Sequence, residues 1–347
     1  MIKPEGRRFE NVDTMRGLAC IMLVLYHVIS GLRLSPDHVL VLFNGALSDM
    51  RMPMFAFLSG FVLLPRINTA SDLFISIRKK ARRLLLPLLS VGTLHWCLQE
   101  KFSGEPGRPL WQIAFFPFEH FWFLQATFLV LSSIYLICYL FRNKMTDGLY
   151  AALFAVSLLY VAIDRHPDTF FSAWEATYLA PFIIAGVLIR TKDASIIFRN
   201  KTAILIGWVA VCCMNILASQ MLPDEHGFSR ALDIWVGMAT CLMVFSQSFV
   251  SPALATIGRR SYAIFLFHAF FTVGSRIIIR KLWPDTPVVV LAPIGLAAGL
   301  VFPFLLQPLI MKSSLTALLF LGIDGARRDR RRETLASGSA ARISSSP

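Results

Sequence analysis

The sequence predicts an all-α integral membrane protein, a polytopic bundle of about ten transmembrane helices with both termini in the cytoplasm. Three observations lead to this class. Hydrophobic residues make up 56% of the 347 residues and charged residues only 16%, against about 25% charged residues in an average soluble domain. Apolar runs close to the roughly 20 residues that cross a bilayer recur along almost the whole chain. Lysines and arginines gather in the loops that would share one side of the membrane.

The apolar runs between prolines, glycines and charged residues define the predicted spans. Runs such as 126–141 and 203–222 are apolar on nearly every helical face, whereas an amphipathic helix of a soluble protein keeps a polar face. This pattern disfavours a soluble helical protein. The predicted spans are residues 14–33, 46–65, 84–100, 119–141, 148–164, 172–190, 202–222, 230–250, 261–279 and 287–311.

The distribution of basic residues predicts the orientation. The segments on the side of the two termini hold 24 lysines and arginines, and those on the opposite side hold 9. Because an excess of basic residues marks the cytoplasmic side, both termini are predicted to be cytoplasmic. The formal net charge is +13. Because the basic residues lie in short loops and the tail, membrane topology explains this charge, and we expect the lipid bilayer and no nucleic acid as a partner.

Two regions are predicted, a transmembrane domain over residues 1–312 and a basic cytoplasmic tail over residues 313–347. The tail carries a run of arginines from Arg327 followed by serine, alanine and glycine, a composition typical of disordered segments that attract anionic headgroups.

The six cysteines form no C-x-x-C motif, so we expect neither a disulfide framework nor a bound metal. Arg16 interrupts the approach to the first apolar run, so no cleaved signal peptide is expected.

Two ionisable residues inside the first predicted span are candidates for chemistry, because a charge within a bilayer is costly. Arg16 and His27 are eleven positions apart, which places them on nearly the same helical face and about 16 Å apart along the axis. A neutral histidine accepts a proton from a hydroxyl, and an arginine holds phosphate or carboxylate. The alternative is structural: Arg16 extends to the interface and pairs with Asp13, and His27 bonds a neighbouring helix.

Five stretches of the chain carry a family resemblance. They are Asn11–Leu18 with Tyr26–His27, Pro53–Phe61, Arg82–Pro87 preceded by Lys79 and Lys80, His120–Leu124, and Gly258–Tyr262 with Phe267–His268. In this order they resemble the motifs of the acyltransferase family 3 membrane proteins, over about residues 10–310. One position departs from the family pattern. The first arginine of a pair that the family spaces by two residues is Lys80 here, and a lysine meets phosphate only as a point charge.

The resemblance implies a membrane O-acyltransferase that moves an acyl group, acetyl first, from acyl-CoA to a hydroxyl of a cell-surface or exported saccharide. It implies the bacterial cell inner membrane as the location and glycan-assembly proteins as partners. By the same resemblance His27 is the general base, His268 is a second catalytic residue, and Arg16 holds the donor. Acetyl-CoA would be bound by Arg16 with the cytoplasmic cluster Lys79, Lys80, Arg82 and Arg83, and the saccharide by Ser59, His120 and Trp122.

Each of these residues also has a structural interpretation. The basic cluster satisfies membrane topology without any ligand. Ser59 precedes Gly60, a combination that favours close helix packing over a nucleophile. His120 lies near Trp122 at an interface, where aromatic residues are common. For His268, a satisfied core histidine is slightly favoured over a catalytic role. A different class of function, a transporter or flippase of a glycan or lipid-linked saccharide, would use Arg16 and His27 to line a substrate or proton path.

Overall fold

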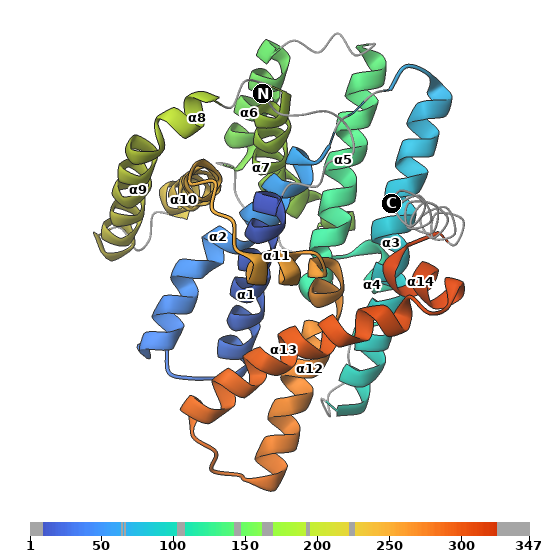
Figure 1. Ribbon diagram of the computed structural model, residues 1–347, viewed down its shortest axis with the longest axis vertical. Coiled ribbons are helices and arrows are strands. Elements are labelled where there is room, and N and C mark those ends of the chain that lie inside the picture. The colour runs from blue at the N-terminus through green and yellow to red at the C-terminus, as the bar shows by residue number, and fades with distance from the viewer. Residues whose placement is uncertain are drawn as a thin grey trace, which may run out of the picture.

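The computed structural model describes residues 10–63, 65, 67–102, 108–141, 147–161, 169–191, 195–221 and 226–324 (Figure 1). All regular structure in these residues is helical. The helices are α1 (Glu10–Gly31), α2 (Val39–Phe61), α3 (Ala70–Phe102), α4 (Gln112–Phe115), η1 (Glu119–Phe121), α5 (Trp122–Leu140), α6 (Asp147–Val161), η2 (Phe170–Ser172), α7 (Ala173–Thr191), α8 (Ser195–Arg199), α9 (Lys201–Met221), α10 (His226–Ser246), α11 (Pro252–Gly258), α12 (Ser261–Leu282), α13 (Val288–Ile310) and α14 (Ser314–Leu321).

Six helical segments of the described chain are long and apolar enough to cross a membrane, which confirms the predicted all-helical membrane class. They are Glu10–Gly31, Gln112–Leu140, Phe170–Thr191, Lys201–Ala218, Ser261–Leu282 and Val288–Ile310. Each of the ten predicted spans coincides with a helix, but the crossing of α2, α3, α6 and α10 stays a prediction. The connections α1–α2 and α12–α13 lie at the same end of the bundle (Figure 1).

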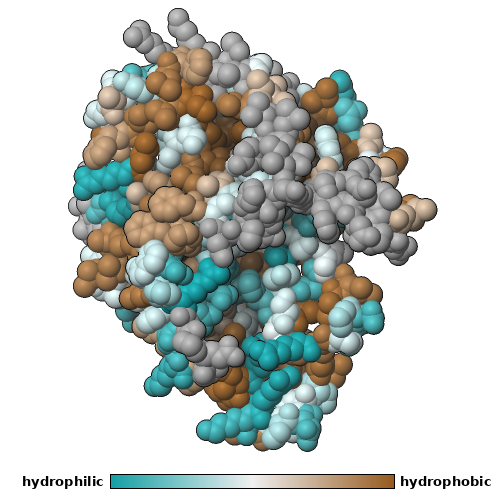
Figure 2. All heavy atoms as spheres, turned by 180° about the vertical axis from the view of Figure 1, so that it is seen from behind, coloured by the Kyte–Doolittle hydropathy of each residue, from teal (hydrophilic) through white to brown (hydrophobic). Residues whose placement is uncertain are grey.

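The surface of the bundle is apolar over large areas. Figure 2 shows broad hydrophobic regions, with hydrophilic side chains gathered toward the lower end of the view. Helix α9 is the clearest case, because no residue of Lys201–Ala218 is buried within the protein. Ile206 and Leu217 of this helix are exposed. Such side chains are stable in contact with lipid and costly in contact with water. The distribution therefore fits a protein surrounded by a bilayer.

Helix α3 is longer than the predicted span at 84–100. It begins at Ala70 and carries the basic cluster within the same 33-residue helix. A reciprocal capping arrangement starts it: the Thr69 hydroxyl accepts the amide N–H of Asp72 at 3.1 Å, and the Asp72 carboxylate accepts the Thr69 amide N–H at 3.0 Å. Such a capping box satisfies two amide groups that a helix start otherwise leaves unpaired. The turns of α3 that carry the basic cluster are therefore part of a regular helix.

Close backbone contacts explain two of the sequence motifs. A Cβ atom on Gly17 of α1 would lie 2.0 Å from the Leu254 carbonyl oxygen, and one on Gly258 would lie 1.8 Å from the Asp13 carbonyl oxygen. Helices α1 and α11 therefore touch along their backbones. The same holds for α2 and α7, since a Cβ on Gly60 would lie 1.9 Å from the Ile183 carbonyl oxygen. The close-packing interpretation of the Ser-Gly pair is confirmed.

The C-terminal end of the bundle differs from the expected boundary at residue 313. Helix α14 covers Ser314–Leu321 and ends at Gly322, whose φ of 61° is left-handed. Leu321 is buried, and the Ser90 hydroxyl of α3 donates to the Leu319 carbonyl oxygen at 2.6 Å. The apolar residues of α14 pack on α3, so helical structure that contacts the bundle continues past residue 313. Residues 325–347 of the predicted basic tail, which include its run of arginines, lie outside the described residues.

Candidate active site

Four histidines from four separate segments meet inside the bundle: His27 of α1, His95 of α3, His120 of η1 and His268 of α12. The ring centroids of His27 and His268 are 4.8 Å apart, those of His120 and His268 are 4.8 Å apart, and those of His27 and His120 are 5.7 Å apart. His95 lies 6.0 Å from His120. We call these four residues the histidine cluster. The structure thus brings together three residues that the sequence indicated separately.

The ring nitrogens of His268 have different surroundings. Nδ1 lies 3.0 Å from the Ile264 carbonyl oxygen and 2.9 Å from that of Phe265. Because a carbonyl oxygen only accepts, Nδ1 carries the proton and donates it. Nε2 is therefore an unprotonated acceptor, and it is buried with no hydrogen-bond partner among the described residues. Buried polar atoms normally have a partner, so an unpaired one points to a ligand or a transferable proton.

His120 repeats this arrangement. It is buried and makes a backbone hydrogen bond to Leu266, while its Nε2 has no partner in the described part of the chain. Two histidines of the cluster thus present unused nitrogens in the interior. The observation weakens the interpretation of His268 as a satisfied core histidine, because only one of its two nitrogens is satisfied.

Aromatic side chains surround the histidine cluster. Phe121 lies 4.1 Å from His120 between ring centroids, and Phe265 lies 5.5 Å from His120. Phe55 and Phe123 contact Phe265 at 6.3 and 5.5 Å. These rings exclude water from one side of the cluster. Hydrogen bonds and charge interactions are stronger in such a low-dielectric environment than in water.

An arginine that no sequence motif indicated as a site residue lies beside the cluster. Arg51 is inside α2, and its guanidinium carbon stacks 3.3 Å above the centroid of the Tyr26 ring. The Tyr26 ring is itself 5.2 Å from the His27 ring. The Nη1 atom of Arg51 is buried and has no hydrogen-bond partner among the described residues. Asp49, two positions earlier, supplies a nearby negative charge.

The signals for Arg51 and His95 were present in the sequence but ambiguous. Asp49 and Arg51 sit at the edge of an apolar run, where a charge is ordinarily placed in a loop. His95 has no motif around it, and only the packing of α3 against η1 places it next to His120. Tertiary contact therefore identifies both residues, and periodicity does not.

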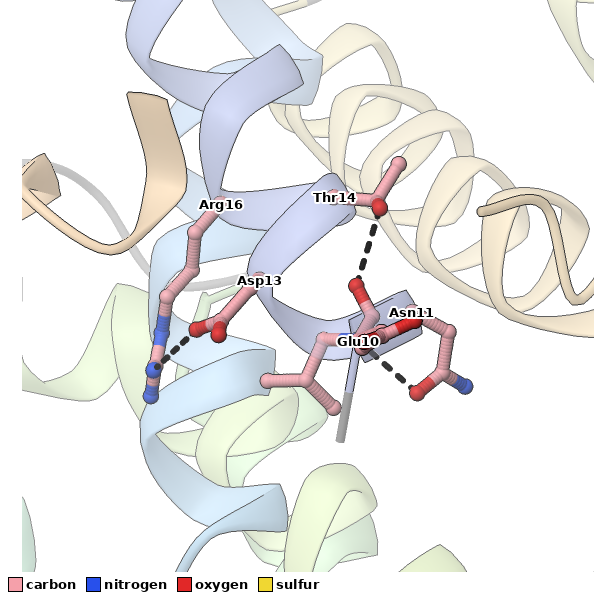
Figure 3. Close-up of polar contacts among 6 residues, drawn as sticks. Glu10, Asn11, Asp13, Thr14 and Arg16 are labelled. Atoms are coloured by element: carbon pink, nitrogen blue, oxygen red, sulfur yellow. Dashed lines mark hydrogen bonds and ion pairs between the residues drawn. The ribbon is translucent and has the colours of Figure 1, made fainter. Parts of the chain in front are cut away.

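Arg16 lies at the other end of α1. Its Nη1 atom is 3.6 Å from the Asp13 carboxylate, three residues earlier on the same helix, and Figure 3 shows the two side chains pointing toward each other. Asp13 is almost fully buried, whereas the Arg16 side chain is 28% exposed. The pairing with Asp13 expected from the sequence is confirmed. Arg16 is on the helix of His27 but about 16 Å away along the axis.

The cytoplasmic basic cluster does not present four equivalent cations. Arg82 pairs with Asp324 at 2.5 Å, just beyond α14. Arg83 stacks 4.0 Å above the Tyr262 ring and donates a hydrogen bond to the Leu321 carbonyl oxygen. Lys79 is exposed. Burial, and next the neighbouring Arg83, lower the pKa of Lys80 below its ordinary value.

The remaining predicted substrate residues, Ser59 and Trp122, contact phenylalanines that surround the histidine cluster. The Ser59 hydroxyl donates to the Phe55 carbonyl oxygen at 2.8 Å, a bond within its own helix. Trp122 begins α5, is half-buried and contacts Phe123 edge to face at 6.1 Å. Among the described residues, no group of three or more histidine, cysteine or acidic side chains has the arrangement of a metal site.

These features define the class of the protein, a polytopic helical membrane protein that encloses a cluster of protonatable side chains. The acyltransferase 3 family, described as an acyltransferase domain, matches residues 9–307. The chain therefore belongs to this family and is a membrane acyltransferase, as the motif resemblance predicted. No curated protein and no solved structure matches the chain.

Proposed function

We propose that this protein is an O-acyltransferase that moves an acyl group, acetyl first, from acyl-CoA to a hydroxyl of a cell-surface or exported saccharide. The observation that carries the proposal is the contact of His27 with His268 and His120 inside an acyltransferase fold. Acyl transfer to a hydroxyl needs a base at the reacting atoms. The histidine cluster supplies one in a site partly closed to water.

In this proposal His27 is the general base. It takes the proton of the acceptor hydroxyl while the hydroxyl oxygen bonds to the thioester carbonyl carbon. The carbon–sulfur bond then breaks, and the proton passes from His27 to the CoA thiolate. His268 is a positioning residue in this proposal: its Nε2, which is unpaired in the structure, takes an N–H from His27 when the substrates bind. The second nitrogen of His27 is then held ready for the hydroxyl, much as a carboxylate orients a catalytic histidine.

The donor is proposed to enter from the cytoplasmic end. Arg16, Lys79 and Lys80 supply positive charge there for the phosphates of acetyl-CoA. Arg82 and Arg83 join them when the phosphates replace Asp324 and the Leu321 carbonyl oxygen as partners. His27 lies about 25 Å along α1 from Glu10, at about 1.5 Å per residue, so the thioester must reach deep into the bundle. The acceptor approaches from the opposite side, past His120 and Trp122.

Transfer of label tests the proposal. Membranes that contain the protein are incubated with radiolabelled acetyl-CoA, and label in the glycan fraction is compared with that from membranes carrying His27→Ala at equal abundance. The matched control is His38→Asn, which changes a histidine outside the cluster and preserves the cap of α2, where His38 accepts the Leu40 amide N–H.

We expect label with the wild type and with His38→Asn, and none with His27→Ala. Equal labelling by all three would exclude His27 as the base. Absence of label with every acyl-CoA donor, together with transport of a lipid-linked saccharide, would favour a transporter or flippase instead. The bacterial inner membrane and glycan-assembly partners are part of the proposal, since an exported saccharide is made at that membrane.

A further inference from the structure

A polar cavity of about 240 Å³ opens beside the histidine cluster. It lies where the C-terminal part of α3 meets the segments on either side of α4, and its lining is Trp96, Gln99, Arg108, Pro117, Phe118 and Glu119. Two of these residues directly follow or precede members of the cluster in sequence, since Trp96 follows His95 and Glu119 precedes His120. None of the six was indicated as a site residue by the sequence motifs.

Hydrogen bonds hold the polar groups of this cavity in place. The Trp96 indole N–H donates to the Arg108 carbonyl oxygen at 2.6 Å, and the Gln99 amide donates to the Glu119 carboxylate at 2.6 Å. Glu119 has a φ of 44°, in the left-handed region that glutamate rarely occupies. Backbone strain of this kind persists where the surrounding structure enforces it, and it is concentrated at functional sites.

The chemistry of the lining matches a sugar ring. An indole offers a flat, amphipathic surface to the C–H face of a pyranose. A carboxylate accepts hydrogen bonds from two neighbouring hydroxyls, while amide and guanidinium groups donate to ring and hydroxyl oxygens. Arg108 and Glu119 balance each other in charge, so the cavity as a whole does not select an ion. Cavities that enclose drug-sized ligands measure about 300–1,000 Å³, so this smaller one suits a single ring.

We propose that this cavity binds one neutral pyranose ring of the saccharide acceptor, next to the residue that is acylated. The inference rests on the proposed function and names the acceptor class for it. Phe118 lines the cavity and contacts the cluster, because its ring lies 5.8 Å from that of His95, which is 6.0 Å from His120. A ring held in the cavity therefore directs the next sugar of the same chain toward His120 and His27.

Direct binding of simple sugars tests the cavity independently of catalysis. The full chain is placed in lipid nanodiscs free of alkyl-glycoside detergents, whose sugar headgroups would compete. Saturation-transfer NMR then measures binding of neutral methyl pyranosides (gluco, galacto and manno) and of a methyl glucuronoside. The variants are Glu119→Gln and Arg108→Gln. Matched controls are Asp285→Asn and Arg280→Gln, two exposed charges near the α12–α13 connection that do not line the cavity.

We expect at least one neutral pyranoside to bind the wild type and both controls equally. Binding should weaken about tenfold in Glu119→Gln and Arg108→Gln, because each loses a charged hydrogen-bonding group. A conservative variant, Trp96→Phe, keeps the aromatic face and should retain binding more fully than Trp96→Ala. Circular dichroism and size-exclusion profiles equal to wild type identify the variants that fold.

Three results would overturn the proposal: no binding of any neutral pyranoside, binding of the glucuronoside alone, or equal binding in the cavity variants and the wild type. The outcome separates this proposal from the proposed function. His27-dependent acyl transfer with unchanged acceptor KM in Glu119→Gln would contradict the sugar site in the cavity and support the acyltransferase function. Sugar binding that depends on Glu119, without acyl transfer, would support the sugar site and favour a glycan transporter or flippase over an acyltransferase.

Discussion

The imidazole rings of His27 and His268 lie 4.8 Å apart and inclined by 53°, although the two residues belong to the first and one of the last helices of the chain. His268 is fixed through Nδ1 to its own helix backbone, so its Nε2 faces the site as an acceptor. We expect His27→Ala to lower kcat by about a hundredfold or more, since general base catalysis contributes about 10²–10⁴.

His268→Asn should lower kcat less, by about tenfold, because it removes a partner of the base and leaves the base in place. The KM values for both substrates should change little, since neither residue is proposed to hold the ground-state substrates. Steady-state kinetics on purified protein measures both effects. A double variant that loses no more than His27→Ala alone would show that the two histidines act as one unit, whereas full additivity would contradict the positioning role.

The stacking of Arg51 on Tyr26 predicts a stability effect. Arg51→Met removes the buried guanidinium and leaves Asp49 without its nearby cation, so we expect a loss of about 1–3 kcal/mol of unfolding free energy. Tyr26→Phe keeps the ring beneath the guanidinium and should lose less than about 1 kcal/mol. Thermal unfolding in detergent compares the two variants. A larger loss in Tyr26→Phe than in Arg51→Met would contradict the stacking as the stabilising contact.

The contact of α2 with α7 predicts that a single methyl group disrupts it. A Cβ on Gly60 or on Gly186 would lie 1.9 or 2.1 Å from a backbone oxygen of the facing helix. Because the helices must separate, Gly60→Ala should destabilise the protein by about 1–3 kcal/mol. Gly207→Ala is the control: it lies within α9, where an added Cβ meets no atom within 4 Å. Alanine should be neutral or stabilising there, as helix propensity favours it.

The ion pair of Arg82 with Asp324 predicts a change in donor affinity. If Arg82 binds phosphate as proposed, Asp324→Asn frees it and should lower the KM for acyl-CoA severalfold, and Arg82→Gln should raise that KM. Stability should change by less than about 1 kcal/mol in Asp324→Asn, because the pair is partly exposed. The effect on KM should shrink at high salt. An unchanged KM in both variants would assign Arg82 to the packing of α14 alone.

The predicted orientation is testable by labelling. In a background without reactive cysteines, Asp285→Cys at the α12–α13 connection should react with a membrane-impermeant maleimide added to intact cells. Lys312→Cys, between α13 and α14, should react only after the membrane is opened. The opposite pattern would place both termini outside and reverse the direction from which acyl-CoA is proposed to enter.

Much of the site was recognisable from residue types. His27 and Arg16 stood out because an ionisable group inside an apolar run costs free energy unless it has a partner. His120 and His268 were indicated by motif, and the structure places both against His27. Their depth and mutual distance could not be predicted, since helical periodicity fixes which face a residue occupies but not which helix meets that face.

The sequence by itself determined the membrane class, the positions of ten helices and the family, because hydrophobic runs of bilayer length permit only a helix and local motifs survive in order along the chain. Tertiary structure decided the rest. It placed Arg51 on the Tyr26 ring beside His27, gave Arg82 and Arg83 partners at the C-terminal end of α14 and just beyond it, and assembled a cavity from residues that no motif indicated. These contacts join residues far apart in the chain, and only the packing of whole helices brings such residues together.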